Sequence, residues 1–486
     1  MLNNPITLPM WQIAIPVILS VFFILEKLLI PSVRWMIRRK VNRVLTEISE
    51  HLQIEIRPFQ LTKRKVLIDR LIFDPKVIEG MEAHVKLNKM PREVAQQEVL
   101  QYAREIVPAF NAYVYYRWIY RMCRYACRQL YRIRVGVADE NEIRSIDRTA
   151  TVVFVINHRS NIDYMLVAYL ASKQTTLSYA AGEWAKVFLL QSLIRAMGAF
   201  FVRRDSRNPL YRRVLERYVH MATREGVCQA VFPEGGLTKT GALARPKLGF
   251  IDYMLRGFDV EKDRDIVFVP VGINYDKVLE DNIQINAAKG IPISRSLWKW
   301  GKVIFRFVVA NFSIPKAQRH DLFGYASVNF GRVISVKMFA QEQGINFISL
   351  DKDTRFRYTA ILGEKLMNGI GYVTPILPVP LIAQAFKQTA ENSLSELEVI
   401  SKVHDLIDTL ISYGAPINNA EKPAKKTLQK ALALMIHYSM LEFRDDRYHA
   451  VDTSSELLSY YANSIAHWFE QVEHIDPRPQ SIGEAA

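Results

Sequence analysis

The clearest chemical signal in this 486-residue chain is a histidine and an aspartate separated by four residues, His158 and Asp163. If the intervening turn brings the two side chains together, the carboxylate fixes the imidazole tautomer and leaves the other ring nitrogen as a general base. No serine, threonine or cysteine is clearly placed beside the histidine as a nucleophile, so the acceptor substrate would supply the attacking hydroxyl. A helix cap beside a surface histidine would show the same spacing. Further groups of residues are needed to decide between the two interpretations.

The segments on either side of this pair predict where its side chains lie. Residues 151–156 are apolar and rich in β-branched residues, which is typical of a buried strand. Residues 164–170 favour a helix. His158 is therefore expected just beyond the carboxyl end of a strand, where open α/β sheets bind ligands. Asp163 is expected at a helix start, where the backbone dipole favours a carboxylate.

Basic and glycine-rich groups follow other predicted strands, and together they suit a phosphate group. Arg203 and Arg204 close the run 198–204, and residues 269–273 form a Val-Pro-Val-Gly-Ile strand end. Between them lies a glycine-rich turn with two lysines, whose candidate binding residues are Glu234, Gly235, Gly236, Lys239 and Lys247. This turn is not a Walker loop, because Thr238 rather than glycine precedes Lys239.

Strand and helix patterns alternate through the middle of the chain, which predicts an α/β fold with a mixed sheet flanked by helices. The predicted strands are 151–156, 177–182, 198–204, 227–232, 266–273 and 328–336. A helix beginning with Asn208 as cap and Pro209 in its first turn is expected to end at Gly226. We predict a sheet domain at 136–340, between mostly helical regions at 41–135 and 341–486.

The N-terminal segment predicts a membrane anchor at residues 1–40. Ile6 to Leu25 is almost entirely apolar and has roughly the 20 residues that a bilayer-spanning helix needs. Basic residues cluster directly after it, which places the rest of the chain in the cytoplasm, at the cell or inner membrane. A hydrophobic hairpin within one leaflet is the alternative. Residues 371–386 are also apolar, but three prolines interrupt them, so we expect a buried or interfacial segment.

The formal net charge of +15 suits nucleic acid, anionic lipid or a polyanionic substrate. No zinc-finger or RNA-binding signature is present, so we expect no nucleic-acid partner. Aromatic and basic residues mix over 113–134, as on a membrane surface or on a solvated helix with a buried aromatic stripe. Cys123 and Cys127 have no second pair to complete a metal site, and we expect no metal and a reduced, cytosol-facing chain.

In order along the chain, these groups resemble the four motifs of the glycerolipid acyltransferases. Residues 158–163 are similar to the first motif, H-x4-D, and 198–204 to the second. Residues 232–236 are similar to the third, and the region around Pro270 to the fourth. Length and the segments Val373-Thr-Pro375 and Tyr460 to His467 most resemble the large membrane-bound glycerol-3-phosphate acyltransferases.

The resemblance implies transfer of a fatty acyl group from acyl-CoA or acyl-acyl carrier protein to the sn-1 hydroxyl of glycerol 3-phosphate, without a cofactor. His158 would be the base and Asp163 its orienting carboxylate. Arg203, Arg204, Lys239 and Lys247 would hold the phosphate. Glu234, in the turn with Gly235 and Gly236, would orient acceptor hydroxyls or basic groups, unless it only stabilises that turn.

One departure leaves the acceptor open. Where the glycerol-3-phosphate enzymes usually continue the third motif with Arg-Ser-Arg, this chain has Leu237, Thr238 and Lys239. A lysophosphatidate or other lysophospholipid acyltransferase is therefore the nearer alternative. A non-catalytic membrane scaffold is the more distant one, and the intact His158 and Asp163 argue against it.

Overall fold

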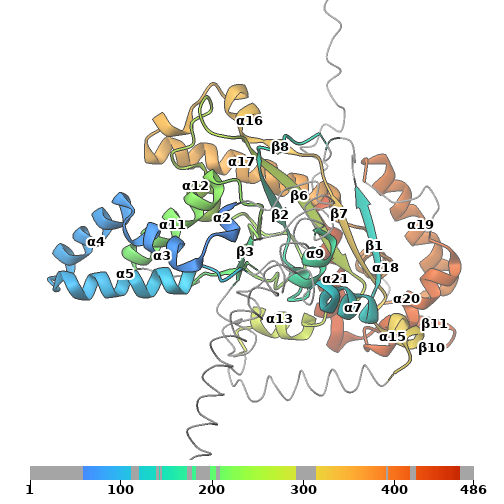
Figure 1. Ribbon diagram of the computed structural model, residues 1–486. Coiled ribbons are helices and arrows are strands. Elements are labelled where there is room, and N and C mark those ends of the chain that lie inside the picture. Colours follow the sequence, from blue (N-terminus) through green and yellow to red (C-terminus); the bar gives the residue numbers. More distant parts are fainter. Residues whose placement is uncertain are drawn as a thin grey trace, which may run out of the picture. The chain divides into compact units, whose positions relative to one another are not determined.

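The computed structural model is shown in Figure 1. The structure describes residues 58–110, 120–137, 142, 145–171, 178–181, 198–203, 208–291, 314–389, 392–415 and 423–470. The predicted anchor at 1–40 and the candidate phosphate ligand Arg204 lie outside the described residues. The predicted domain boundaries stay predictions.

The described part of the chain contains an eight-stranded mixed sheet, which confirms the predicted α/β fold with a mixed sheet flanked by helices. Its strands are β1 (Arg132–Val137), β2 (Thr151–Ile156), β3 (Ser178–Ala181), β4 (Phe200–Phe201), β5 (Gln229–Val231), β6 (Ile266–Tyr275), β7 (Tyr325–Phe330) and β8 (Ile334–Ser335). The order is β1-β7-β6-β2-β5-β3-β4, and β8 pairs with β6. Strand β2 runs parallel to both β5 and β6, whereas β7 is antiparallel to β6.

Strand β2 lies inside the sheet, and its side chains enter two hydrophobic cores. Val153 and Val155 belong to one core, while Val152, Phe154 and Ile156 belong to the other. Successive side chains of a strand point to opposite faces, so a sheet covered on both faces requires an unbroken apolar run. This is why all six residues of β2 are buried and why the run carried no polar alternation.

One face of the sheet packs against α11 (Pro209–Arg224), which begins and packs as the sequence predicts. The Asn208 side chain accepts hydrogen bonds from the backbone N–H groups of Leu210 (2.9 Å) and Tyr211 (3.2 Å). The predicted apolar positions are all buried: Leu210, Val214, Leu215, Tyr218, Val219 and Ala222. Helices of the N-terminal region contribute to the same core; they are α2 (Pro58–Leu61), α3 (Arg64–Ile72), α4 (Pro75–Asn88) and α5 (Arg92–Ile106).

The predicted strand at 328–336 is two strands and the start of a helix. Strand β7 ends at Phe330, β8 covers only Ile334–Ser335, and α16 (Val336–Glu342) follows at once. The Ser335 hydroxyl accepts from the backbone N–H of Met338 (3.1 Å) and donates to the Asp265 carboxylate (2.6 Å). This helix cap, completed by a distant carboxylate, stops the strand where hydrophobicity alone would continue it.

The C-terminal region is mostly helical, as predicted, with one addition. Its longer helices are α17 (Lys352–Val373), α18 (Pro378–Lys387), α19 (Glu396–Ser412), α20 (Lys425–His437) and α21 (Ser455–Ala462), and short turns are η3 (Phe347–Ser349), η4 (Asp452–Ser454), η5 (Asn463–Ile465) and α22 (His467–Glu470). A small antiparallel sheet, which the sequence did not predict, joins β9 (Ser393–Ser395), β10 (Leu441–Arg444) and β11 (Arg447–Ala450). The remaining helices are α7 (Tyr120–Leu130), α9 (Asp163–Ala171), α12 (Gly249–Leu255), α13 (Asp281–Ala288) and α15 (Lys316–Phe323).

The proline-interrupted apolar segment is a core element. Residues 378–386 of α18 are all buried, which confirms the buried alternative for this stretch. Within the described residues, no individual helix has both the length and the apolar composition of a membrane span. Helices α17 and α18 meet those criteria only as a pair, and they are bent by 99° at their junction.

Candidate active site

The turn between β2 and α9 brings His158 and Asp163 into direct contact. Nδ1 of His158 lies 2.9 Å from Oδ2 of Asp163, and both side chains are buried. The same carboxylate oxygen accepts the backbone N–H groups of Arg159 (2.7 Å) and Ser160 (2.9 Å). Because Asp163 is the first residue of α9, its charge also lies at the positive end of a helix. The predicted pairing is therefore present, and the turn itself holds the carboxylate in place.

The second ring nitrogen of His158 has no such partner. Nε2 is buried and forms no hydrogen bond within the described part of the chain. The imidazole packs against the Phe232 ring at 4.2 Å between centroids and meets Tyr164 edge-on at 5.3 Å. With the proton of Nδ1 directed at Asp163, Nε2 carries the lone pair that a general base requires.

Asn157 explains how β2 can end at Ile156, two residues before the histidine. Its side-chain amide donates to the backbone carbonyl of Ile273 (2.9 Å) and accepts the N–H of Ile273 (2.7 Å). The side chain thus continues the β2–β6 pairing for one more position, while the backbone is free to turn. Because an amide side chain here takes the place of a peptide group, it orients the start of the candidate catalytic turn, residues 157–162.

Both oxygens of Glu234 are occupied by backbone donors. Oε1 accepts the N–H of His158 (2.8 Å), and Oε2 accepts the N–H of Ala244 (3.1 Å). Burial raises the pKa of Glu234, while these hydrogen bonds and the nearby Arg159 oppose that rise. These contacts fix the position of the His158 backbone against the glycine-rich turn.

Gly235 makes room for a lysine in this turn. Its φ of +70° favours glycine, and a Cβ built on it would come within 2.5 Å of Cδ of Lys247. The lysine side chain therefore lies directly across Gly235. Lys239 is exposed and contributes nothing to the cavity that Lys247 lines.

Sequence reasoning missed three residues that hold the candidate catalytic turn. The Tyr275 hydroxyl donates to Oδ1 of Asp163 (2.6 Å). Glu280 accepts the Ser160 hydroxyl (2.6 Å) and the side-chain N–H of Asn161 (3.1 Å), and its burial raises its pKa. A usable signal was present in the sequence, because a tyrosine ends the buried strand β6 and four charged residues follow it within residues 276–281.

Arg159 is the third missed residue, and it joins the turn to distant parts of the chain. Its buried guanidinium donates to the backbone carbonyl groups of Gly241 and Ser464, the latter at 3.2 Å. Burial lowers the pKa of Arg159, while nearby Tyr460, Glu234 and Asp163 raise it. Ser464 belongs to the C-terminal region, so that region forms part of the support of the catalytic turn.

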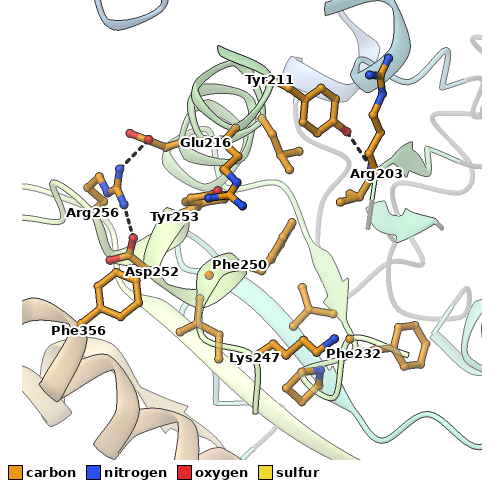
Figure 2. Close-up of a pocket in the computed structure, with 18 of the residues that line it drawn as sticks. Arg203, Tyr211, Glu216, Phe232, Lys247, Phe250, Asp252, Tyr253, Arg256 and Phe356 are labelled. Atoms are coloured by element: carbon orange, nitrogen blue, oxygen red, sulfur yellow. Dashed lines mark hydrogen bonds and ion pairs between the residues drawn. The ribbon is translucent and has the colours of Figure 1, made fainter. Parts of the chain in front are cut away.

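A cavity of about 960 Å³ adjoins the turn (Figure 2). Its lining includes His158, Phe232, Gly235, Gly236 and Lys247. Arg203 also lines it, but its guanidinium forms an ion pair with Glu105 (2.6 Å) and stacks over two tyrosine rings. Figure 2 shows the Arg203 side chain extending away from Lys247. Of the predicted phosphate ligands that the structure describes, Lys247 lines the cavity without an ion pair, and Arg203 lines it already paired.

Family comparisons agree with the order of motifs. The family described as Acyltransferase matches residues 134–274, and the one described as Glycerol-3-phosphate acyltransferase C-terminal region matches residues 312–471.

Similar curated proteins include glycerol-3-phosphate acyltransferases from Ectopseudomonas mendocina (28% identical over 449 residues) and Pseudomonas entomophila (27% over 444 residues). Each alignment covers 89% of this chain and 52% of the relative, so the chain spans about half the length of these relatives. A crystal structure of the 1-acyl-sn-glycerophosphate acyltransferase from Thermotoga maritima matches with 16% identity, 53% coverage of this chain, 79% coverage of that chain and a TM-score of 0.29. The two family matches, together with relatives that align over most of this chain's length, make the chain similar to the glycerol-3-phosphate acyltransferases in both its sheet region and its C-terminal region.

Proposed function

We propose that this protein transfers a fatty acyl group from acyl-CoA or acyl-acyl carrier protein to the sn-1 hydroxyl of glycerol 3-phosphate, producing lysophosphatidate for phospholipid synthesis. The observation that carries the proposal is the buried contact of 2.9 Å between His158 Nδ1 and Asp163 Oδ2, with Nε2 unpartnered within the described residues and His158 lining the cavity. The names of the similar proteins support the choice of acceptor.

In the proposed reaction, Nε2 of His158 takes the proton of the acceptor hydroxyl as its oxygen attacks the thioester carbonyl. The new C–O bond forms, the C–S bond breaks, and the departing thiolate receives the proton from the imidazolium. Asp163 stabilises the charged imidazole during this exchange. A thiolate is a good leaving group, so no covalent acyl-enzyme is needed.

Lys247 is the residue best placed to hold the acceptor phosphate. It lies across Gly235, beside the turn that binds the His158 backbone, and it forms no ion pair within the described part of the chain. An ammonium group of this kind binds a phosphate as a point charge. Arg203 would attract the phosphate only at a distance, because its guanidinium is bound to Glu105 and extends away from Lys247 (Figure 2).

We also propose that the protein works at the cytoplasmic face of the cell or inner membrane. The apolar segment at residues 6–25 and the net charge of +15 support this location. In α7, cysteines point inward while basic and apolar side chains are exposed together, namely Arg121, Met122, Arg124, Tyr125 and Arg128. A surface of this composition suits anionic lipid headgroups.

The test is an acceptor comparison with the purified full chain. Labelled palmitoyl-CoA and palmitoyl-acyl carrier protein would each be offered with glycerol 3-phosphate, lysophosphatidate or glycerol. We expect labelled lysophosphatidate from glycerol 3-phosphate and little transfer to the other two acceptors. Preferential transfer to lysophosphatidate would replace the proposed acceptor, and no transfer from either thioester to any acceptor would overturn the proposed activity.

A further inference from the structure

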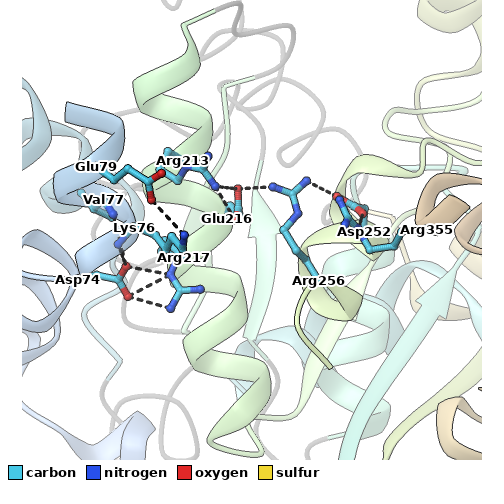
Figure 3. Close-up of polar contacts among 10 residues, drawn as sticks. All are labelled: Asp74, Lys76, Val77, Glu79, Arg213, Glu216, Arg217, Asp252, Arg256 and Arg355. Atoms are coloured by element: carbon cyan, nitrogen blue, oxygen red, sulfur yellow. Dashed lines mark hydrogen bonds and ion pairs between the residues drawn. The ribbon is translucent and has the colours of Figure 1, made fainter. Parts of the chain in front are cut away.

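A chain of ion pairs, drawn in Figure 3, contributes several residues to the lining of the cavity. Glu216 accepts from Arg213 (3.0 Å) and from Arg256 (2.6 Å). Arg256 also pairs with Asp252, which in turn accepts from Nε of Arg355 (2.7 Å). Three arginines thus share two buried carboxylates, and the wall keeps an excess of positive charge.

Other basic residues enlarge that excess. The basic residues in the cavity lining are Arg203, Arg212, Arg213, Lys247, Arg256, Lys352 and Arg355, and the carboxylates are Glu216 and Asp252. Arg203 is balanced by Glu105 and Arg212 has contacts of its own, so the excess rests on the other five. Lys352 is exposed at the first position of α17 and forms no ion pair within the part of the chain that the structure describes. Nε of Arg256 is a buried donor without an acceptor there. Unbalanced positive charge and an unused donor in a cavity wall favour a bound anion.

This wall is distinct from the position of Lys247. Figure 2 shows Lys247 next to Phe232, whereas Arg256, Glu216 and Asp252 lie on another side of the pocket, beyond Phe250 and Tyr253. At about 960 Å³, the cavity is near the upper end of the roughly 300–1,000 Å³ typical of sites for drug-sized ligands. A three-carbon phosphate would occupy only part of that space, so a second and larger ligand is expected.

We propose that this wall binds the phosphate of the acyl donor's carrier arm, with Lys352 as its unpaired cation and with Arg213, Arg256 and Arg355 together in excess over the two carboxylates that they share. Coenzyme A and acyl carrier protein both present the acyl thioester on a pantetheine arm whose other end is a phosphate ester. A single basic wall can therefore serve both donors, and guanidinium groups match the geometry of phosphate oxygens. The assignment rests on the proposed function, because it requires a thioester donor. Lys247 remains the proposed ligand of the acceptor phosphate.

The test measures binding without turnover. Isothermal titration of the full chain would compare 4′-phosphopantetheine with pantetheine, which lacks the phosphate, and with glycerol 3-phosphate. The variants are Lys352→Gln, which breaks no ion pair, and Arg256→Lys, which keeps one charge beside the two carboxylates. Lys365→Gln, on the same helix but outside the cavity lining, is the control for loss of a lysine charge; it also removes an exposed ion pair with Glu342 (3.3 Å).

We expect the wild-type protein to bind phosphopantetheine roughly tenfold more tightly than pantetheine, as charge-assisted contacts to one phosphate would give. Lys352→Gln and Arg256→Lys should each reduce that ratio roughly threefold or more, while Lys365→Gln and the affinity for glycerol 3-phosphate stay unchanged. Equal binding of the two arms by the wild-type protein, or an unchanged ratio in both variants, would overturn the assignment. If the two variants instead bind glycerol 3-phosphate more weakly than the wild-type protein does, the wall binds the acceptor phosphate and the assignment to the donor is wrong. These results do not depend on acyl transfer, so a failed acceptor comparison is distinguishable from a failed donor site.

Discussion

The hydroxyl of Tyr275 donates a hydrogen bond of 2.6 Å to Oδ1 of Asp163, on the carboxylate whose other oxygen meets His158. Tyr275 is the last residue of β6, and its ring is fully buried. The partner of the candidate base is thus held from three sides, by its own turn, by the histidine and by a neighbouring strand. Tyr275 does not line the cavity, yet it helps to determine where the carboxylate lies.

Tyr275→Phe is expected to lower kcat without changing either KM, because the hydroxyl contacts Asp163 rather than a ligand. A hydrogen bond to a charged group contributes at most about 1.5–3 kcal/mol, and the other contacts to Asp163 remain, so we expect a loss of roughly three- to tenfold. Steady-state kinetics with each substrate varied would measure it. Tyr131→Phe is the matched control, since that buried hydroxyl donates to the Lys277 carbonyl (2.8 Å) instead. A similar loss in both variants would show a general packing effect.

Lys247→Gln should raise KM for glycerol 3-phosphate roughly tenfold and leave KM for the acyl donor unchanged, because it removes one charge-assisted phosphate contact. Arg245→Gln provides the control: Arg245 is an exposed basic residue in the same segment, and it does not line the cavity. Equal increases in both KM values for Lys247→Gln would contradict a specific role at the acceptor phosphate.

Much of this arrangement was predictable from the sequence because it depends on local pattern. The unbroken apolar run of β2, the Asn208-Pro209 helix start and the H-x4-D spacing each predicted the structure observed. Contacts between distant segments were not predictable in the same way. Arg159 finds its acceptors at Gly241 and Ser464, and Arg203 is neutralised by Glu105, a residue 98 positions away. Neither partner leaves a periodic signal in the sequence.

Gly241→Ala should destabilise the protein strongly. The φ of this residue is +84°, and a Cβ built on it would lie 1.8 Å from the backbone oxygen of Tyr460. Since a main-chain atom cannot move aside as a flexible side chain can, we expect a loss of about 3 kcal/mol or more in the free energy of unfolding. Chemical denaturation would measure it. Gly249→Ala is the control, because a Cβ added there would meet nothing within 4 Å, and equal stability of the two variants would contradict the packing described.

Asp276 should make the protein less stable as pH rises through the weakly acidic range. Burial raises the pKa of this carboxyl to about 6. The hydrogen bonds that it accepts from the backbone N–H groups of Tyr325 and Val379 act in the opposite direction and lower the pKa. Between the ordinary aspartate pKa near 4 and about 6, the folded state holds the proton more tightly than the unfolded state, so this group's contribution to stability falls as pH increases. The expected change is roughly 3 kcal/mol.

Unfolding of the wild-type protein and Asp276→Asn by denaturant at a series of pH values from roughly 4 to 7 would isolate this group. The stability of the wild-type protein relative to the variant should decline from about pH 4 to about 6 and become constant above about 6.5. A relative stability that is constant or rises over that interval would contradict the raised pKa.

The most direct test of the central claim is acyl transfer to glycerol 3-phosphate by purified His158→Ala protein, with thermal melting as the folding control. General-base catalysis typically contributes roughly 10²–10⁴-fold, so a folded His158→Ala protein should lose nearly all activity. Asp163→Asn should be severely impaired as well, and the double variant should be little worse than either single one, because the two residues act as a unit. A folded His158→Ala protein that keeps about a tenth or more of wild-type activity would contradict the account.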